Sequence, residues 1–132
     1  MLGRKDFTKD EITNGRTAVE RQLATFDAVP EAAQDVLQKA DYFNDLALAL
    51  DRRYVHRLRS VTGKDGTPLN ELEIIVESLL NNSGALRGNN VIKYVPQDSV
   101  VGMKSGDRIQ LTRDDFARLA AGVFDELDAK YR

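Results

Sequence analysis

A long amphipathic stretch, residues 31–61, is the feature of this 132-residue sequence that most constrains its fold. Apolar residues recur there at steps of three and four, the spacing that places side chains on one face of an α-helix. They are Val36, Ala40, Phe43, Ala47, Leu50, Tyr54 and Leu58. The spacing predicts one continuous helix whose apolar stripe faces a core.

The basic end of this predicted helix is a candidate binding surface. At about 100° per residue, Arg52, His56 and Arg59 fall opposite the apolar stripe. With Arg87 from a later glycine-containing loop, they are the candidate residues for binding an anion or a phosphate group. Cations near a helix C-terminus also interact favourably with the helix dipole, by about 0.3–1 kcal/mol each, so a purely structural role remains open.

Two apolar residues on the otherwise polar far side of the same helix are candidate interface residues. These are Leu48 and Val55. Apolar side chains in such positions suggest contact with another element or subunit, so the sequence predicts a homo-oligomer.

Three further helices are predicted from their start signals. Thr8 and Thr112 each begin a capping-box pattern, and Thr67 precedes a proline suited to the first helical position. The helix after Thr8 ends before Pro30, with Gly15 slightly weakening its middle. The next ends in the turn formers of residues 81–84, and the last runs to the C-terminus.

Between the third and last predicted helices, the pattern changes to period two with β-branched residues, which is typical of strands. Residues 91–95 form one predicted strand, and residues 100–103 and 108–111 form a predicted hairpin around a turn at residues 104–107. The predicted fold is a single α+β domain over residues 1–132. It is mainly helical, with about four helices and a two- or three-stranded antiparallel sheet between the third and last of them.

The residue inventory excludes most common catalytic and metal sites. There is no cysteine and one histidine, so thiolate chemistry and a zinc motif with paired histidines are both excluded. Glu73 and Glu77 lie one helical turn apart, but carboxylate-bridged metal sites also need histidines at helical spacing. We predict no metal and no cofactor, we identify no catalytic residue, and a non-catalytic role is favoured over an enzyme.

Charge is unevenly distributed along a chain whose net charge is −2. Residues 1–51 hold 6 basic and 10 acidic side chains, whereas residues 52–108 hold 9 basic and 6 acidic ones. The overall acidity argues against a generic nucleic-acid binder, and the positive middle favours an anionic small molecule or an acidic protein as partner. No apolar run approaches the roughly 20 residues that span a bilayer, and no secretory signal is recognised, so the predicted location is cytoplasmic, without membrane contact.

Two resemblances add to this interpretation. Residues 101–109 (VGMKSGDRI) resemble the turn of swapped-hairpin transcription factors of the AbrB type, which implies DNA binding. Residues 53–58, 61–71 and 89–94 look like the central segments of a family of small uncharacterised actinobacterial-type proteins. That second resemblance implies a bacterial cytoplasmic protein and no particular activity, cofactor or catalytic residue.

The sequence therefore favours a non-catalytic binding or oligomerising module. The alternative is an anion- or phosphate-binding protein, or a small enzyme, that uses the face of Arg52, His56 and Arg59. The third possibility is a DNA-binding regulator. Whether the arginine-rich helix end is an interface or a binding site does not follow from the sequence.

Overall fold

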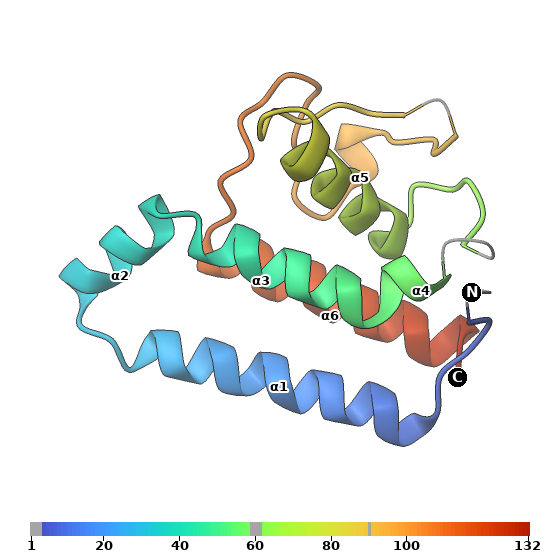
Figure 1. Ribbon diagram of the computed structural model, residues 1–132, viewed down its shortest axis with the longest axis horizontal. Helices are drawn as coiled ribbons and strands as arrows, with labels where there is room; N and C mark the ends of the chain where they lie inside the picture. The colour runs from blue at the N-terminus through green and yellow to red at the C-terminus, as the bar shows by residue number, and fades with distance from the viewer. Residues whose placement is uncertain (1–3, 59–61, 90) are drawn as a thin grey trace.

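A computed structural model describes residues 4–58, 62–89 and 91–132, and in these ranges helices are joined by loops (Figure 1). In chain order the helices are α1 (Lys9–Asp27), α2 (Glu31–Lys39), α3 (Tyr42–Leu50), the π-helical turn η1 (Asp51–Val55), α4 (His56–Leu58), α5 (Pro68–Asn81), the 3₁₀ turn η2 (Pro96–Asp98) and α6 (Arg113–Lys130). The described ranges contain no β-strand, only two isolated β-bridges. The predicted α+β class with an antiparallel sheet is therefore wrong, and the fold is mainly helical.

Helix α6 lies at the centre of this arrangement and contacts α1, α3 and α5. Helices α3 and α4, joined by η1, form one rod beside α6, with α1 on one side of the rod and α5 on the other (Figure 1). The core fills the space between these helices. The apolar residues on the inner face of α6, Phe116, Leu119, Val123 and Leu127, are all fully buried.

All three predicted threonine N-caps are confirmed. Each threonine hydroxyl oxygen accepts a hydrogen bond from the backbone amide three residues on, at 3.1 Å for Thr8 and Thr112 and at 3.4 Å for Thr67. Both predicted capping boxes also form, because the carboxylates of Glu11 and Asp115 accept hydrogen bonds from the backbone amides of their threonines. Each cap is worth about 1 kcal/mol of stability.

The predicted continuous helix over residues 31–61 is wrong, because the chain breaks between α2 and α3. Asp41 has a φ of 62°, in the left-handed region that short polar side chains tolerate better than most. The break turns α2 away from the body of the protein (Figure 1). Val36 is consequently 66% exposed and Ala40 is also exposed, although the spacing assigns both to the core face. Residues 59–61 lie outside the described ranges.

The π-helical turn η1 changes which side chains of the rod face the core. A π-helical turn holds one residue more than an α-helical turn, so two successive side chains can point the same way. Here Tyr54 and Val55 both enter the core, and each is 1% exposed. Val55 therefore does not lie on the polar far side where a regular helix would place it. Leu48 is half-buried and packs against the same core.

The predicted strands are loops, in which several of the backbone amides bind side chains instead of a neighbouring strand. The buried carboxylate of Glu71 accepts hydrogen bonds from the amides of Val100 (2.8 Å) and Val101 (3.0 Å). The Oδ1 atom of Asn89 accepts a hydrogen bond from the amide of Ile92 (2.7 Å). Amides engaged in this way are not available to a β-ladder.

The turn at residues 104–107 forms, since the Asp107 amide donates to the Lys104 carbonyl at 3.0 Å. The segment that follows the turn pairs with a different partner from the one predicted. Three backbone hydrogen bonds join residues 106–109 to residues 84–86: Gly106 N to Leu86 O, Leu86 N to Asp107 O, and Ile109 N to Gly84 O. The predicted hairpin between residues 100–103 and 108–111 is thus replaced by a brief contact with the chain that leaves α5.

Candidate functional site

A hollow of about 370 Å³ lies between α5 and the rod, and we call it the α5 cleft. Its lining residues come from η1, α4 and α5: Asp51, His56, Glu73, Val76, Glu77, Leu80 and Asn81. The volume falls within the range of about 300–1,000 Å³ that is typical of small-molecule sites. His56, one of the candidate anion-binding residues, is therefore on the wall of a real hollow.

The charges around His56 do not suit an anion. Three carboxylates line the α5 cleft, those of Asp51, Glu73 and Glu77, and neither an arginine nor a lysine is among its described lining residues. Like charges at short range repel, so Glu77 disfavours a phosphate or carboxylate ligand there, whereas Asp51 and Glu73 have other interactions. Sequence reasoning missed this acidity because the carboxylates come from two separate helices.

The other candidate anion-binding residues are not gathered at this cleft. Arg52 is exposed and does not line it, and Arg59 lies outside the described residues. Arg87 lines a second hollow of about 340 Å³, which we call the Arg87 hollow. Its lining residues all lie between α5 and α6: Leu86, Arg87, Gly88, Asn89, Ile92, Tyr94, Pro96 and Ser105. The two hollows share no lining residue, so the structure separates Arg87 from His56.

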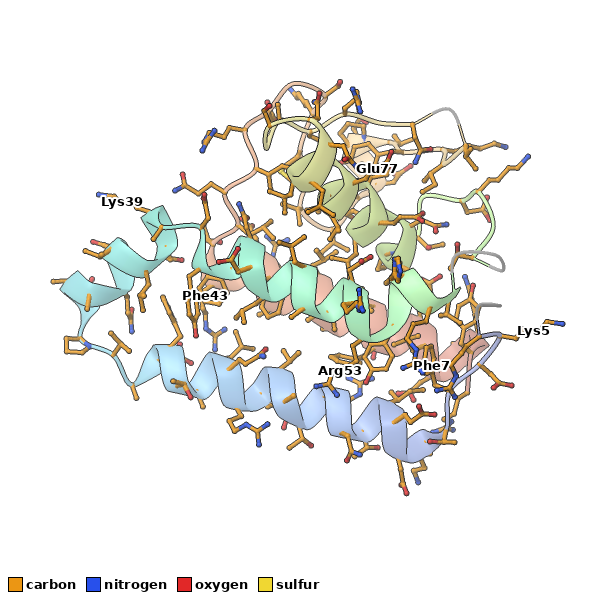
Figure 2. All side chains as sticks on the ribbon, in the orientation of Figure 1. Lys5, Phe7, Lys39, Phe43, Arg53 and Glu77 are labelled. Atoms are coloured by element: carbon orange, nitrogen blue, oxygen red, sulfur yellow. The ribbon has the colours of Figure 1, made fainter. Side chains whose placement is uncertain are left out.

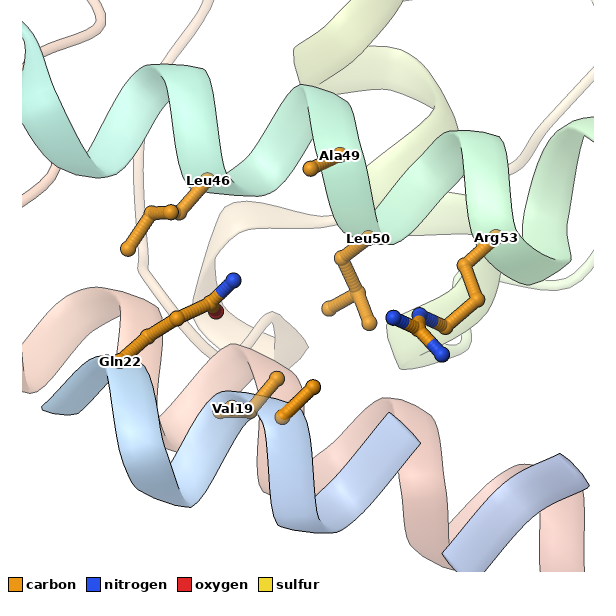
Figure 3. Close-up of a pocket in the computed structure, with 7 residues that line it drawn as sticks. Val19, Gln22, Leu46, Ala49, Leu50 and Arg53 are labelled. Carbon is orange, nitrogen blue, oxygen red and sulfur yellow. The ribbon is translucent and has the colours of Figure 1, made fainter. Parts of the chain in front are cut away.

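A third and much smaller hollow, about 60 Å³, lies in the seam between α1 and the rod. Figure 3 shows Leu50 and Val19 facing one another there, with the polar side chains of Gln22 and Arg53 reaching into the same space. In Figure 2, Arg53 likewise lies on the side of the rod that faces α1. The space holds a few water molecules at most, so it is a packing gap and not a ligand site.

Two buried carboxylates have structural partners that account for their burial. Glu71 is 1% exposed; burial raises the pKa of its carboxyl group, and the amides of Val100 and Val101 act in the opposite direction. Glu126 is 7% exposed and accepts a hydrogen bond from the amide of Leu69 in the first turn of α5, at 3.0 Å. Both side chains bind orphan backbone amides, so neither is a candidate catalytic acid.

The two candidate interface residues lie within the chain's own packing. Val55 belongs to the core, and Leu48 packs against it. The apolar side chains that are most exposed are elsewhere, on α2, on the last turn of α5 and in the loop before η2: Val36, Leu80, Val91 and Val95. Of these, only Val36 lies on a helix that has no buried residue.

Neither metal binding nor a membrane span is indicated by the part of the chain that the structure describes. In that part, no group of three or more His, Cys, Asp or Glu side chains is arranged to hold a metal ion, and no helix is long and apolar enough to cross a bilayer. No protein-family model, curated protein or solved structure matches this chain. The resemblance to small actinobacterial-type proteins therefore stays a prediction.

Proposed function

We propose that this chain is a non-catalytic binding module that associates with a second copy of itself through α2. The observation that carries the proposal is the exposed apolar face of α2, since only its inner side, at Leu37, packs against the core. None of the nine residues of α2, all of them described, is buried, and Val36 at its centre is 66% exposed. Helices in soluble proteins normally bury their apolar stripe, so a stripe left open marks a surface for association.

The exposed stripe is narrow and made of small side chains. Ala32, Val36 and Ala40 follow one another at intervals of four residues, and all three are exposed. Small residues at this spacing allow two helices to approach closely, because no bulky side chain holds the backbones apart. In Figure 1, α2 projects at the end of the molecule away from both termini, where a second helix can reach it.

The charges on α2 favour a second copy in antiparallel orientation. Glu31 and Asp35 lie in its N-terminal half, and Lys39 is its last residue. A two-fold axis at the middle of the helix places each Lys39 beside the acidic end of the other copy, so both ends of the contact gain opposite charges. In Figure 2, Lys39 extends from the end of α2 into solvent, free to make such a contact.

The size of the surface sets the expected strength. A nine-residue helix is about 14 Å long and cannot by itself supply the roughly 800 Å² per partner of a standard interface. Self-association through α2 should therefore be weak and strongly dependent on concentration. Its function would then be to assemble copies where the protein is locally concentrated.

Sedimentation velocity over a wide concentration range tests the proposal. Val36→Lys places a charge at the centre of the stripe, and Leu80→Lys is a matched control because Leu80 is also 66% exposed. We expect the mean mass to rise with concentration for the parent chain and for Leu80→Lys, and to stay at that of one chain for Val36→Lys. A single-chain mass at every concentration, or an equal effect of both substitutions, would contradict the proposal.

The alternative functions have less support. For an anion site or small enzyme on the face of Arg52, His56 and Arg59, a ligand held by His56 would lie next to the carboxylates of Glu73 and Glu77. DNA binding through the basic middle of the chain is opposed by the net charge of −2. The resemblance of residues 101–109 to a swapped hairpin also loses its structural basis, because this segment forms no hairpin here.

A further inference from the structure

We propose that the Arg87 hollow binds a small organic anion, with a carboxylate or monophosphate group held by Arg87 and a planar apolar body lying in the hollow. This site is separate from α2, and the inference does not depend on self-association. Four features of the hollow carry it: an unpaired guanidinium, apolar walls, loops fixed by hydrogen bonds, and a local excess of positive charge.

The guanidinium of Arg87 is available to a ligand. Arg87 is exposed, and its side chain makes no hydrogen bond or ion pair with any residue in the described ranges. Its backbone is held firmly, since the amide donates to Ser78 Oγ (3.0 Å) and the carbonyl accepts from the same hydroxyl (3.3 Å). An arginine with a fixed backbone and a free planar head can bind a carboxylate or a phosphate through two parallel hydrogen bonds.

The walls of the hollow are largely apolar. Leu86 and Ile92 are 1% and 6% exposed, and the half-buried Tyr94 and Pro96 complete this side. The Tyr94 hydroxyl is already used, because it donates to the Met103 carbonyl at 2.6 Å, so the ring is what a ligand would meet. A bare inorganic anion would leave these walls exposed to water, whereas a ring attached to the anion would cover them.

Hydrogen bonds fix the loops that form the hollow before any ligand arrives. Asn89 Oδ1 accepts from the amides of Val91 (2.9 Å) and Ile92 (2.7 Å), which ties Asn89 to these two residues. Gly106, next to the lining residue Ser105, donates to the Leu86 carbonyl at 2.7 Å. A site that is already ordered loses little conformational entropy on binding.

The loops around the hollow carry more positive than negative charge. From residue 84 to residue 112 the basic side chains are Arg87, Lys93, Lys104 and Arg108, and the acidic ones are Asp98 and Asp107. One of the two acids is engaged, because Asp107 Oδ2 accepts a hydrogen bond from the Lys104 amide at 2.7 Å. The carboxylate of Glu71 also lies against these loops, held by the amides of Val100 and Val101, so four basic side chains there face three acidic ones. No arginine or lysine is among the described lining residues of the α5 cleft, so an anion should prefer the Arg87 hollow.

The test is an NMR titration of the full chain with four small probes. Benzoate and phenyl phosphate carry a ring and an anion, inorganic phosphate carries only the anion, and benzamidine carries the ring with a cation. We expect benzoate or phenyl phosphate to shift the amide signals of residues 86–89, 91–95 and Ser105, and we expect inorganic phosphate to bind more weakly. The tighter of the two ring anions identifies the class of natural ligand.

Two substitutions make the result specific. Arg87→Gln should weaken binding of the ring anions about ten- to a hundredfold, the loss expected for one charge-assisted hydrogen-bonding group. Arg52→Gln, at an exposed arginine that lines neither large hollow, should leave binding unchanged. Arg87→Glu should reverse the preference, so that benzamidine binds and benzoate does not.

Three outcomes would overturn the inference. They are binding of benzamidine as tight as that of benzoate, an undiminished affinity of Arg87→Gln, and signal shifts centred on residues outside this hollow. Binding at Arg87 with no self-association would contradict only the function proposed for α2. The reverse result would contradict only the ligand site, so the two proposals can fail independently.

Discussion

Replacing Gly15 with alanine should destabilise the protein, although the same change in most helices has the opposite effect. Gly15 lies in the middle of α1 and is buried. Alanine normally stabilises such a position by about 0.5–1 kcal/mol, because it restricts the unfolded chain. Here an added Cβ would lie 1.8 Å from the Tyr54 hydroxyl oxygen and 2.7 Å from its Cζ atom. One of the two helices must move to accommodate it.

The Tyr54 side chain cannot move away from the added methyl group without losing packing contacts and a hydrogen bond. Its ring is 1% exposed and makes edge-to-face contacts with Phe7, at 5.1 Å between centroids, and with Phe124, at 5.8 Å. Its hydroxyl donates a hydrogen bond of 2.6 Å to the Glu11 carbonyl in α1. Overpacking costs about 1–3 kcal/mol and a lost hydrogen bond about 1 kcal/mol. Set against the helix propensity of alanine, the net loss for Gly15→Ala is about 2 kcal/mol.

Urea denaturation followed by circular dichroism measures this loss as a change in the free energy of unfolding. Asn14→Ala is the control, since Asn14 is exposed in the same helix and alanine there should stabilise by about 0.5 kcal/mol. Tyr54→Phe removes the hydroxyl that the new methyl group would strike. The double substitution should therefore cost less than the sum of the single ones. Unchanged stability in Gly15→Ala, or strict additivity in the double variant, would refute the reasoning.

Two further predictions concern carboxylates. Glu71→Gln should destabilise by about 1–3 kcal/mol, because the new side chain has one acceptor oxygen for the two loop amides that Glu71 binds; faster hydrogen exchange of those amides would verify it. The Arg4 guanidinium lowers the pKa of Glu11 to about 2 from an ordinary value of 4.5, so the stability from this pair is present above about pH 4.5 and is lost as the pH falls through 2. An NMR titration of the Glu11 carboxyl should give this pKa, and Arg4→Gln should raise it towards the ordinary value.

The helix starts were predictable from the sequence because the interactions that fix them are local. A threonine cap binds an amide only three residues away, so Thr8, Thr67 and Thr112 contain nearly all the information needed. The buried face of the last helix was predictable for the same reason, since its spacing matches one regular helix. Predictions of this kind need no knowledge of what the helix packs against.

The interruptions of the helix over residues 31–61 were not predictable from spacing. Asp41 adopts a left-handed φ of 62°, which aspartate tolerates but does not require. The residue type at this position therefore does not predict a break in the helix. The π-helical turn at Asp51–Val55 likewise leaves the composition of the stripe unchanged while it rotates Val55 into the core. Both features depend on packing against other helices.

The prediction of a sheet was wrong because an alternating pattern of β-branched residues is not sufficient to form a strand. A strand also needs a partner for its amides, and here the partner of Val100 and Val101 is Glu71, about thirty residues earlier in the chain. A glutamate inside a predicted amphipathic helix gives no sign that its carboxylate will be buried against a distant loop. Hydrogen bonds from loop amides to a distant side chain can therefore override local β propensity.

The same long-range packing decides where the excess positive charge of residues 52–108 lies in the folded protein. Residues 52–108 carry 9 basic and 6 acidic side chains, and sequence alone assigned their excess to the end of the rod. Packing α5 against the rod brings Glu73 and Glu77 to the wall that His56 lines, which opposes that excess locally. In the loops after α5, backbone amides bind two nearby carboxylates: those of Val100 and Val101 bind Glu71, and that of Lys104 binds Asp107. An anion attracted by the positive middle of this chain is therefore expected at Arg87 and not at His56.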